Sequence, residues 1–134
     1  MYLRFVVAQK HWESGREMGI FHAFRYLRDD GDLYAYEEDQ HDYIRQWFNC
    51  NLARPTRFTA SKSPSYRKPS KAICWFKHTA HRHLSWAWWM VAMLEHHQVP
   101  VYLLKSTRVG YVVYEDDYQI VAEPFADLWF NTPF

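Results

Sequence analysis

An uninterrupted apolar run from Trp86 to Leu94 constrains the fold of this chain more than any other sequence feature. The run lies in a segment from about Ser70 to Gln98 whose apolar residues recur at helical spacing and predict one long helix. The stripe consists of Ile73, Phe76, Ala80, Leu84, Ala87, Val91 and Leu94. Within the run, apolar side chains surround the helix, so a sheet and other helices, or a partner, must cover every side of it. A break at 78–83, which would give two helices, is the alternative.

The rest of the sequence predicts two further helices and four strands. A strand is expected at Tyr2–Ala8, followed by a helix that the capping-box pattern Ser14–Glu17 begins and Gly31 ends. The next helix is expected from Ala35 to Asn51. The closing strands are expected at Val99–Lys105, Gly110–Glu115 and Tyr118–Glu123. The order β-α-α-α-β-β-β indicates an α+β fold with a four-stranded, mainly antiparallel sheet and helices packed on one face.

The chain has the size and composition of one soluble domain. At 134 residues it falls within the usual range for a single α+β domain, which we expect to span 1–134. A chain of this length can bury a core without disulfides or metal, so Cys50 and Cys74 are expected to be free thiols. No signal-peptide pattern precedes the first strand, and the apolar run is too short to cross a bilayer. We therefore expect a cytoplasmic protein with no membrane partner.

Two segments of opposite charge stand out in a chain whose net charge is +1. Seven acidic residues and no Lys or Arg lie between Asp29 and Asp42, whereas six basic and no acidic residues lie between Arg54 and Lys71. The second segment includes a Pro- and Ser-rich stretch at 55–70, which predicts a long loop. Its cations can neutralise phosphates and its rings can stack on unpaired bases. The candidate nucleic-acid-binding residues are Arg54, Arg57, Phe58, Lys62, Tyr66, Arg67, Lys68 and Lys71. A solvated loop, or a segment that pairs with the acidic one, are the alternatives.

On the third predicted helix, Trp75, Trp86 and Trp89 lie off the main apolar stripe. Trp, Tyr and Met are concentrated at the centres of protein interfaces. The candidate protein-binding residues are Trp75, Trp86, Trp89, Met90 and Met93. They predict contact with a protein partner or formation of a homo-oligomer. The alternative is that the other two helices cover this face.

The last two strands are expected to form a hairpin with a two-residue turn at Asp116–Asp117. This register places Tyr114 opposite Gln119. One face of the hairpin must cover the helices, and the other would then present a platform of aromatic, amide and carboxylate groups. The candidates for this sheet platform are Tyr114, Gln119 and Glu123. Such a platform suits a base, a peptide or an arginine-rich partner, and an ordinary solvated sheet face is the alternative.

The histidines and carboxylates form no recognised catalytic motif. His78, His81 and His83 invite a zinc site, yet on one helix His83 points away from His81. The sequence contains no H-E-x-x-H, C-x-x-C, P-loop or G-x-S-x-G pattern. We therefore expect no metal, no cofactor and no catalytic residue. An enzyme that uses the histidines, or the carboxylates of Glu115 and Glu123, is the third hypothesis.

Several short stretches carry a resemblance to known proteins. They are Ser14–Arg16, Trp47–Asn49, Phe58, Trp75–Lys77 and, above all, Gly110–Phe125. Together they resemble a family of small, uncharacterised bacterial proteins of about this length, and the resemblance covers nearly the whole chain. It implies a bacterial or phage origin, and it implies no activity, cofactor, partner or functional residue.

The sequence thus favours a small binding protein that acts through the aromatic surface of its third helix, as a regulator, an inhibitor or a subunit of an assembly. A nucleic-acid-binding protein that uses the basic segment is the runner-up. Salt separates the two, because phosphate binding weakens steeply with salt whereas an aromatic interface hardly responds.

The basic segment can be tested with one triple variant, Arg67→Ala with Lys68→Ala and Lys71→Ala. If the segment binds nucleic acid, the variant loses binding and its salt dependence becomes flat, with little change in stability. If the segment pairs with the acidic residues, the variant is less stable, and high salt destabilises the wild type in the same way. A binding titration and a thermal unfolding curve measure both effects. No change in either would exclude the nucleic-acid hypothesis.

Overall fold

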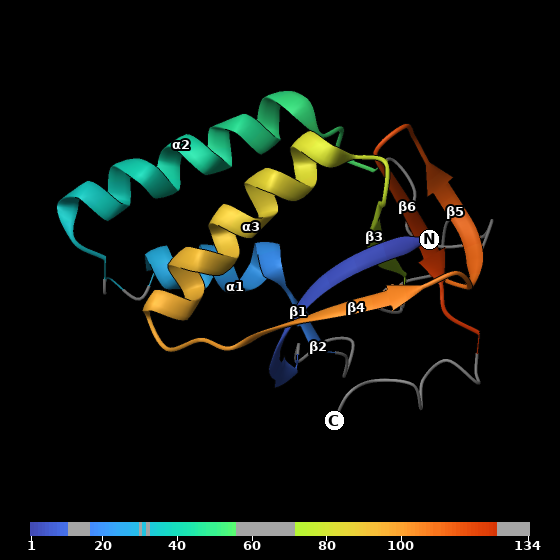
Figure 1. Ribbon diagram of the computed structural model, residues 1–134, viewed down its shortest axis with the longest axis horizontal. Helices are drawn as coiled ribbons and strands as arrows, with labels where there is room; N and C mark the ends of the chain where they lie inside the picture. Colours follow the sequence, from blue (N-terminus) through green and yellow to red (C-terminus); the bar gives the residue numbers. More distant parts are fainter. Residues whose placement is uncertain (11–16, 30, 32, 56–71, 126–134) are drawn as a thin grey trace, which may run out of the picture.

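The computed structural model of the chain describes residues 1–10, 17–29, 31, 33–55 and 72–125 (Figure 1). Within these residues the chain forms three helices and six strands. In chain order they are β1 (Tyr2–Lys10), β2 (Glu17–Gly19), α1 (Ile20–Asp29), α2 (Ala35–Asn51), β3 (Ile73–Lys77), α3 (His81–His96), β4 (Val101–Ser106), β5 (Tyr111–Glu115) and β6 (Gln119–Glu123). The α+β class is confirmed, but the predicted four-stranded sheet and the β-α-α-α-β-β-β order are wrong. None of the described helices is long and apolar enough to cross a membrane.

The strands form a curled sheet in the order β2-β1-β3-β6-β5, with β4 beside β1. The centre of this sheet is β1, which pairs with β4 along one edge and with both β3 and β2 along the other. Tyr2 and Leu3 lie opposite β3, whereas Val6 and Val7 lie opposite β2. All five described strand pairs are antiparallel, which confirms the predicted strand direction.

Arg4 occupies the place along β1 where the pairing changes from β3 to β2. Its Nη1 donates a hydrogen bond to the carbonyl oxygen of Cys74 in β3 (3.2 Å). A Cβ at Gly19 in β2 would lie 3.4 Å from Nη2 of Arg4, so the missing side chain lets the guanidinium approach this strand. The guanidinium thus connects two strands that do not pair with each other.

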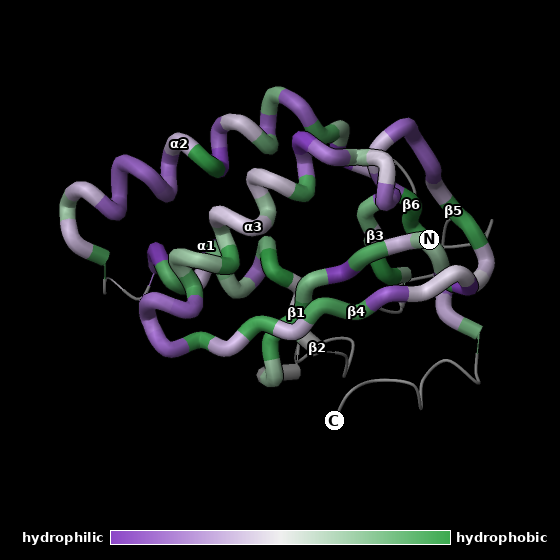
Figure 2. The backbone as a smooth tube through the Cα atoms, in the orientation of Figure 1, coloured by the Kyte–Doolittle hydropathy of each residue, from purple (hydrophilic) through white to green (hydrophobic). Residues whose placement is uncertain are grey.

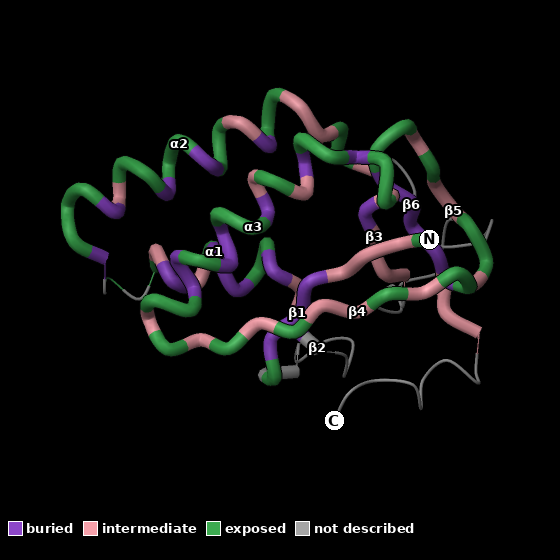
Figure 3. The backbone as a smooth tube through the Cα atoms, in the orientation of Figure 1, coloured by how far each residue is buried: buried purple, intermediate pink, exposed green. Residues whose placement is uncertain are grey.

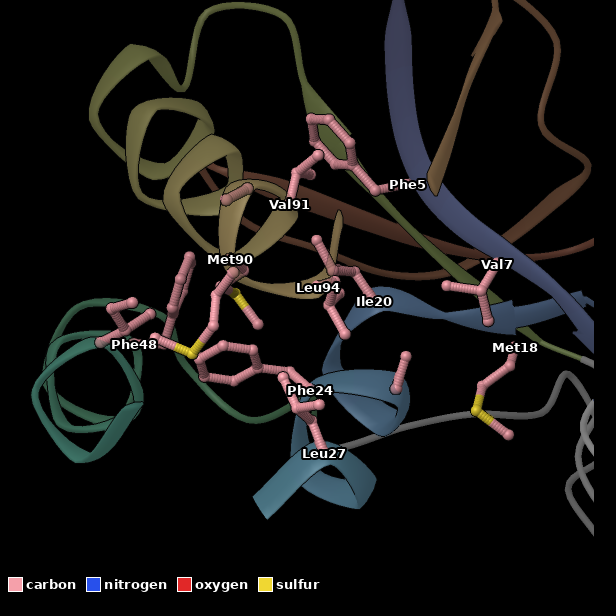
Figure 4. Close-up of a cluster of buried hydrophobic side chains, with 14 of the residues drawn as sticks. Phe5, Val7, Met18, Ile20, Phe24, Leu27, Phe48, Met90, Val91 and Leu94 are labelled. Atoms are coloured by element: carbon pink, nitrogen blue, oxygen red, sulfur yellow. The ribbon is translucent and has the colours of Figure 1, made fainter. Parts of the chain in front are cut away.

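The helices pack against the part of the sheet that β1, β2 and β4 form, and α3 lies between α2 and the β1–β4 pair (Figure 1). Met90 and Leu94 of α3 are 1% and 0% exposed. Figure 4 shows Met90 pointing into the space that Phe24 of α1 and Phe48 of α2 line, while Phe5 of β1 lies on the sheet side of the same cluster. Along α2, buried positions recur at helical spacing among exposed ones (Figure 3), and hydrophilic residues predominate on this helix (Figure 2). The outermost helix, α2, is therefore the most polar of the three helices.

The long helix predicted from Ser70 is wrong over its first part. Ile73–Lys77 forms β3, which pairs with β6 and β1, and the helix begins only at His81. The pattern misled because both faces of β3 carry apolar side chains. Phe76 joins the core beneath the helices, whereas Trp75 packs in a second apolar cluster. A strand that is apolar on both faces shows no alternation to distinguish it from a buried helix. The later part of the segment is helical, as predicted.

The first helix begins later than its capping-box pattern predicted. Glu17–Gly19 forms the short strand β2, and α1 begins at Ile20. Positions 14–16 of the pattern lie outside the described residues. Met18 lies opposite Val7 in the β1–β2 pair and is buried. Pairing with β1 and burial of Met18 outweigh the local preference for a helix start, because tertiary contacts readily override such preferences.

Two histidine contacts hold α2 against α3, one near each end. The predicted span of α2, Ala35 to Asn51, is confirmed. Near its start, the carboxylate of Glu37 accepts a hydrogen bond from Nε2 of His97, just after α3 (2.7 Å). At its end, the carbonyl oxygen of Asn51 accepts one from Nε2 of His83 in the first turn of α3 (2.7 Å). We call these contacts the histidine ties, and they show that α2 and α3 run antiparallel.

A third histidine, His41, joins α2 to α1 inside the core. Its ring stacks on Phe24, with 3.9 Å between ring centroids, and Nε2 lies 2.6 Å from the carbonyl oxygen of the same residue. Because a carbonyl can only accept, Nε2 carries the proton. Nδ1 has no hydrogen-bond partner among the described residues. Burial disfavours a second proton and lowers the pKa of His41 below its ordinary 6.5.

We expect acid to destabilise the fold through His41 and Glu37. The hydrogen bond from His97 lowers the pKa of Glu37, although burial acts in the opposite direction. Both groups therefore bind a proton less readily in the folded state than in the unfolded state. Their stabilising contribution is present at neutral pH and is lost on acidification. His41 acts first, as the pH falls below its ordinary 6.5, and Glu37 follows below 4.5.

The measurement is the free energy of urea unfolding of the wild type and of His41→Gln from about pH 7.5 to about pH 5, the range in which histidine titrates. The glutamine amide can still donate to the carbonyl of Phe24 but has no proton to gain, so this variant is expected to lose less stability in that range. His81→Gln, at an exposed histidine of α3, is the control and keeps the wild-type pH dependence. Equal slopes for the wild type and His41→Gln would contradict the expectation.

Candidate functional site

Four aromatic side chains meet along the outer seam between α2 and α3. Tyr43 and Trp47 come from α2, and Trp86 and Trp89 come from α3. The indoles of Trp47 and Trp86 are stacked, with 4.9 Å between ring centroids and 10° between ring planes. Tyr43 contacts Trp86 and Trp89, with centroid distances of 5.4 Å and 6.1 Å. We call this set of four rings the aromatic ridge.

Much of the aromatic ridge is accessible to solvent. Tyr43 is 60% exposed and Trp89 is 37% exposed. Trp47 and Trp86 are half-buried and pack against the core beneath them. Large apolar side chains that are exposed singly are common, but exposed rings that contact one another form a patch, and such patches mark interaction sites.

The helical repeat explains why these four residues share one seam. Tyr43 and Trp47 are four residues apart on α2, and Trp86 and Trp89 are three apart on α3, so each pair lies on one side of its helix. The neighbouring Ile44 turns into the core and is 0% exposed. The histidine ties keep α2 against α3. They therefore also keep the two halves of the aromatic ridge in contact.

Among the residues that the structure describes, one exposed charged side chain lies one turn beyond each end of the aromatic ridge. Arg82 is exposed one turn before Trp86, and its guanidinium carbon lies 5.7 Å from the centre of the Trp47 ring. This distance is within the range of a cation–π contact. Asp39 is exposed one turn before Tyr43. Because α2 and α3 run antiparallel, Arg82 and Asp39 lie at opposite ends of the ridge.

Three of the five residues predicted for a protein-binding surface do not belong to the aromatic ridge. Met90 and Met93 are buried, at 1% and 5% exposed, because α1 and α2 close over their side of α3. Trp75 lies in β3 and packs in a second apolar cluster, separate from the core beneath the helices. Only Trp86 and Trp89 of the predicted set lie on the ridge.

Sequence reasoning missed the half of the aromatic ridge that α2 supplies. Tyr43 and Trp47 fall at the same helical spacing as the buried Ile44 and Phe48, so the pattern assigns all four to one apolar stripe. The width of this stripe was the available signal. The four residues occupy two adjacent rows along α2. Together these rows cover a wider part of the helix circumference than contact with the core requires.

Most of the candidate nucleic-acid-binding residues lie outside the described residues. Arg54, shortly after α2, is exposed. The others are Arg57, Phe58, Lys62, Tyr66, Arg67, Lys68 and Lys71. Within the acidic segment, Glu38 and Asp42 lie 3.4 Å and 3.3 Å from the guanidinium of Arg28 in α1. Nucleic-acid binding and pairing between the two segments both stay predictions.

The β5–β6 hairpin turns one residue later than predicted. The backbone N–H of Asp116 donates to the carbonyl oxygen of Gln119 (3.0 Å), which leaves Asp117–Tyr118 in the turn. Tyr114 therefore lies opposite Val121 and not opposite Gln119. The carboxylate of Asp116 closes the turn, because it accepts hydrogen bonds from the backbone N–H groups two and three residues further on (2.9 and 3.0 Å).

The predicted sheet platform is not an open surface. Gln119 is buried, and its amide donates to the carbonyl oxygen of Ala53 (2.7 Å) and to the carboxylate of Asp116 (3.0 Å). Tyr114 and Glu123 are half-buried, and the hydroxyl of Tyr114 also donates to Asp116 (2.9 Å). Burial acts to raise the pKa of Asp116, but the hydrogen bonds it accepts lower that pKa below its ordinary value. These side chains thus connect the hairpin to the segment that follows α2.

The histidines and carboxylates considered for catalysis do not converge. Nδ1 of His78 lies 3.1 Å from a backbone carbonyl oxygen, His81 is exposed, and His83 forms one of the histidine ties. Glu115 pairs with Lys77 (2.6 Å), a hydrogen bond that raises the pKa of Lys77. In the part of the chain that the structure describes, no group of three or more His, Cys, Asp or Glu is placed to hold a metal ion.

Comparison with known proteins assigns no family, because no protein-family model, curated protein or solved structure matches this chain. The resemblance to small bacterial proteins therefore stays a prediction.

Cys50 provides a thiol for selective labelling close to the aromatic ridge. It is exposed on α2, three residues after Trp47. Burial raises the pKa of Cys74, although nearby Arg4 acts in the opposite direction. Because the thiolate is the reactive form, we expect a maleimide to label the folded chain at Cys50 alone, and both cysteines after unfolding. Mass spectrometry locates the label, and Cys50→Ser is the control; rapid labelling of folded Cys74 would refute the expectation.

Proposed function

We propose that this chain is a protein-binding module whose contact surface is the aromatic ridge of α2 and α3. Such a module acts by occupying another protein chain, as a regulator, an inhibitor or a subunit of an assembly. The observation that carries the proposal is a connected set of four rings on the surface, of which Tyr43 and Trp89 are exposed and Trp47 and Trp86 are half-buried against the core. Burial of a whole aromatic ring removes roughly 150–250 Å² from water. Contact with a partner would gain the part of this burial that the fold leaves unused.

The residue types of the aromatic ridge fit this role. Trp, Tyr and Arg are the residues whose truncation most often weakens protein complexes. Rings lie at the centre of the ridge, whereas Arg82 and Asp39 lie towards its ends. An apolar centre with a polar rim is the usual arrangement of a protein interface.

The geometry favours a broad apolar contact over a slot for one flat ligand. Trp47 and Trp86 are stacked on each other, and the guanidinium of Arg82 lies over the Trp47 ring. The groups that a ring face attracts are thus already present within the chain. Asp39 at the other end of the ridge repels phosphate, so the ridge does not favour a nucleic-acid strand.

Tyr43→Ala with Trp89→Ala is the variant that tests this surface. These are the two most exposed rings of the ridge, so their removal leaves the core and the histidine ties in place. Partners are captured from native cells with the tagged wild-type chain, identified, purified and titrated against both chains by calorimetry. Affinity is expected to fall by about 30-fold or more, because truncation of a hot-spot residue costs about 2 kcal/mol or more.

Trp88→Ala is the matched control. Trp88 is 50% exposed on α3 but lies on the sheet side of this helix, against Phe5 of β1. Binding through the aromatic ridge leaves the affinity of this variant unchanged. An equal loss in both variants, or no loss in the double variant, would exclude the ridge as the contact surface. A steep fall of wild-type affinity with salt would indicate nucleic acid instead.

A further inference from the structure

The aromatic ridge carries charges of opposite sign at its two ends, and this pattern is complementary to itself. Arg82 stands one turn before Trp86 on α3, and Asp39 stands one turn before Tyr43 on α2. Tyr43 and Trp86 contact each other between these ends, with 5.4 Å between ring centroids. Rotation by half a turn about an axis through this central pair exchanges the positive end and the negative end.

We infer that the aromatic ridge binds the same ridge of a second copy of this chain, around a two-fold axis at the Tyr43–Trp86 pair. The inference rests on the proposed function, since it requires the ridge to be a protein contact surface. In this dimer Arg82 of one copy lies opposite Asp39 of the other. The same contact recurs across the axis, as an isologous interface requires, and the exposed rings meet at the centre.

The dimensions of the helices are consistent with this register. Asp39 precedes Tyr43 by four residues, and Arg82 precedes Trp86 by four residues, which is about 6 Å along each helix axis. Because α2 and α3 run antiparallel, the two charges are displaced from the central pair by similar distances in opposite directions. One register therefore brings both charge pairs together.

Charge complementarity favours a second copy over an unrelated partner. Two ridges that meet head to head would place like charges together, which disfavours that orientation, whereas the two-fold arrangement pairs every ridge charge. Asp42, the other acidic residue near Tyr43, is already engaged by Arg28 at 3.3 Å. Arg45, two residues after Tyr43, lies on the opposite side of α2. Neither residue disturbs the pairing between Arg82 and Asp39.

The size of the aromatic ridge predicts a weak, reversible dimer. Tyr43 is 60% exposed, Trp89 is 37% exposed, and Trp47 and Trp86 are half-buried. If a whole ring buries about 150–250 Å², the four rings together offer roughly 200–400 Å² per copy. Stable complexes bury about 800 Å² per partner. We therefore expect dissociation in the micromolar range, with monomer and dimer in exchange.

Charge reversal tests the register. Arg82→Glu and Asp39→Arg each place like charges opposite one another twice, so each variant is expected to dimerise at least about 10-fold more weakly than the wild type in sedimentation equilibrium. A mixture of the two variants restores both charge pairs, and a heterodimer of wild-type affinity is expected. Arg45→Glu makes the same change in net charge as Arg82→Glu, but on the other side of α2, and leaves the dimer unchanged. Circular dichroism verifies that each variant is folded.

The second-copy inference is wrong if the wild type stays monomeric at about 1 mM, which is well above a micromolar dissociation constant. It is also wrong if the charge-reversed variants dimerise like the wild type, or if the mixture of Arg82→Glu and Asp39→Arg stays monomeric. Tyr43→Ala with Trp89→Ala separates this inference from the proposed function. If the wild type is monomeric and the double variant loses a different protein partner, only the second-copy inference is wrong. If neither self-association nor partner binding responds to the double variant, both are wrong.

Discussion

The fold depends on covering the apolar run of α3, although the expected cover on every side is wrong, because Trp88, Trp89 and Ala92 of this run stay exposed. The β1–β4 pair lies on one side of this helix, and α1 and α2 lie on others. Ala87 and Leu94 are fully buried as a result. Removal of apolar surface from water is the dominant favourable contribution to folding. Because α2 is the outermost element, the part of α3 that α2 covers decides whether Trp86 and Trp89 remain at the surface. The aromatic ridge lies where that cover ends.

The position of α2 is specified by polar contacts as well as by packing. Apolar surfaces tolerate small displacements, but a buried donor or acceptor is satisfied only in one arrangement. Glu37 and Asn51 fix the two ends of α2 through the histidine ties. His83 also stacks on Tyr118 in the hairpin turn, with 4.2 Å between ring centroids. The hairpin, α2 and the start of α3 thus meet at one histidine, and this arrangement preorganises the surface that we propose for binding.

Apolar periodicity predicted the helices in which buried residues recur at helical spacing. It failed where the same pattern fits both a helix and a strand. The span of α2 and the helical nature of Trp86–Leu94 follow from helical spacing. β3 escaped detection because both of its faces carry apolar side chains, and the same error placed Trp75 on a helix. The hairpin register depends on the carboxylate of Asp116, whose capping role is invisible in an alternation pattern. Helical spacing groups Tyr43 with the buried Ile44, because the sequence pattern does not reveal how far a neighbouring helix extends.

Under the proposed function, the four rings of the aromatic ridge would share two roles, packing on the core and contact with a partner, in different proportions. Trp47 and Trp86 pack against the core and stack on each other, so they hold α2 to α3, and their exposed parts would also contact a partner. Tyr43 and Trp89 are more exposed and contribute less to the core. A partner that binds only the folded ridge stabilises it by mass action. The proposed binding would therefore be coupled to the packing of α2 on α3 through the half-buried pair. The exposed pair, in contrast, is free to change with the partner at little cost to the fold.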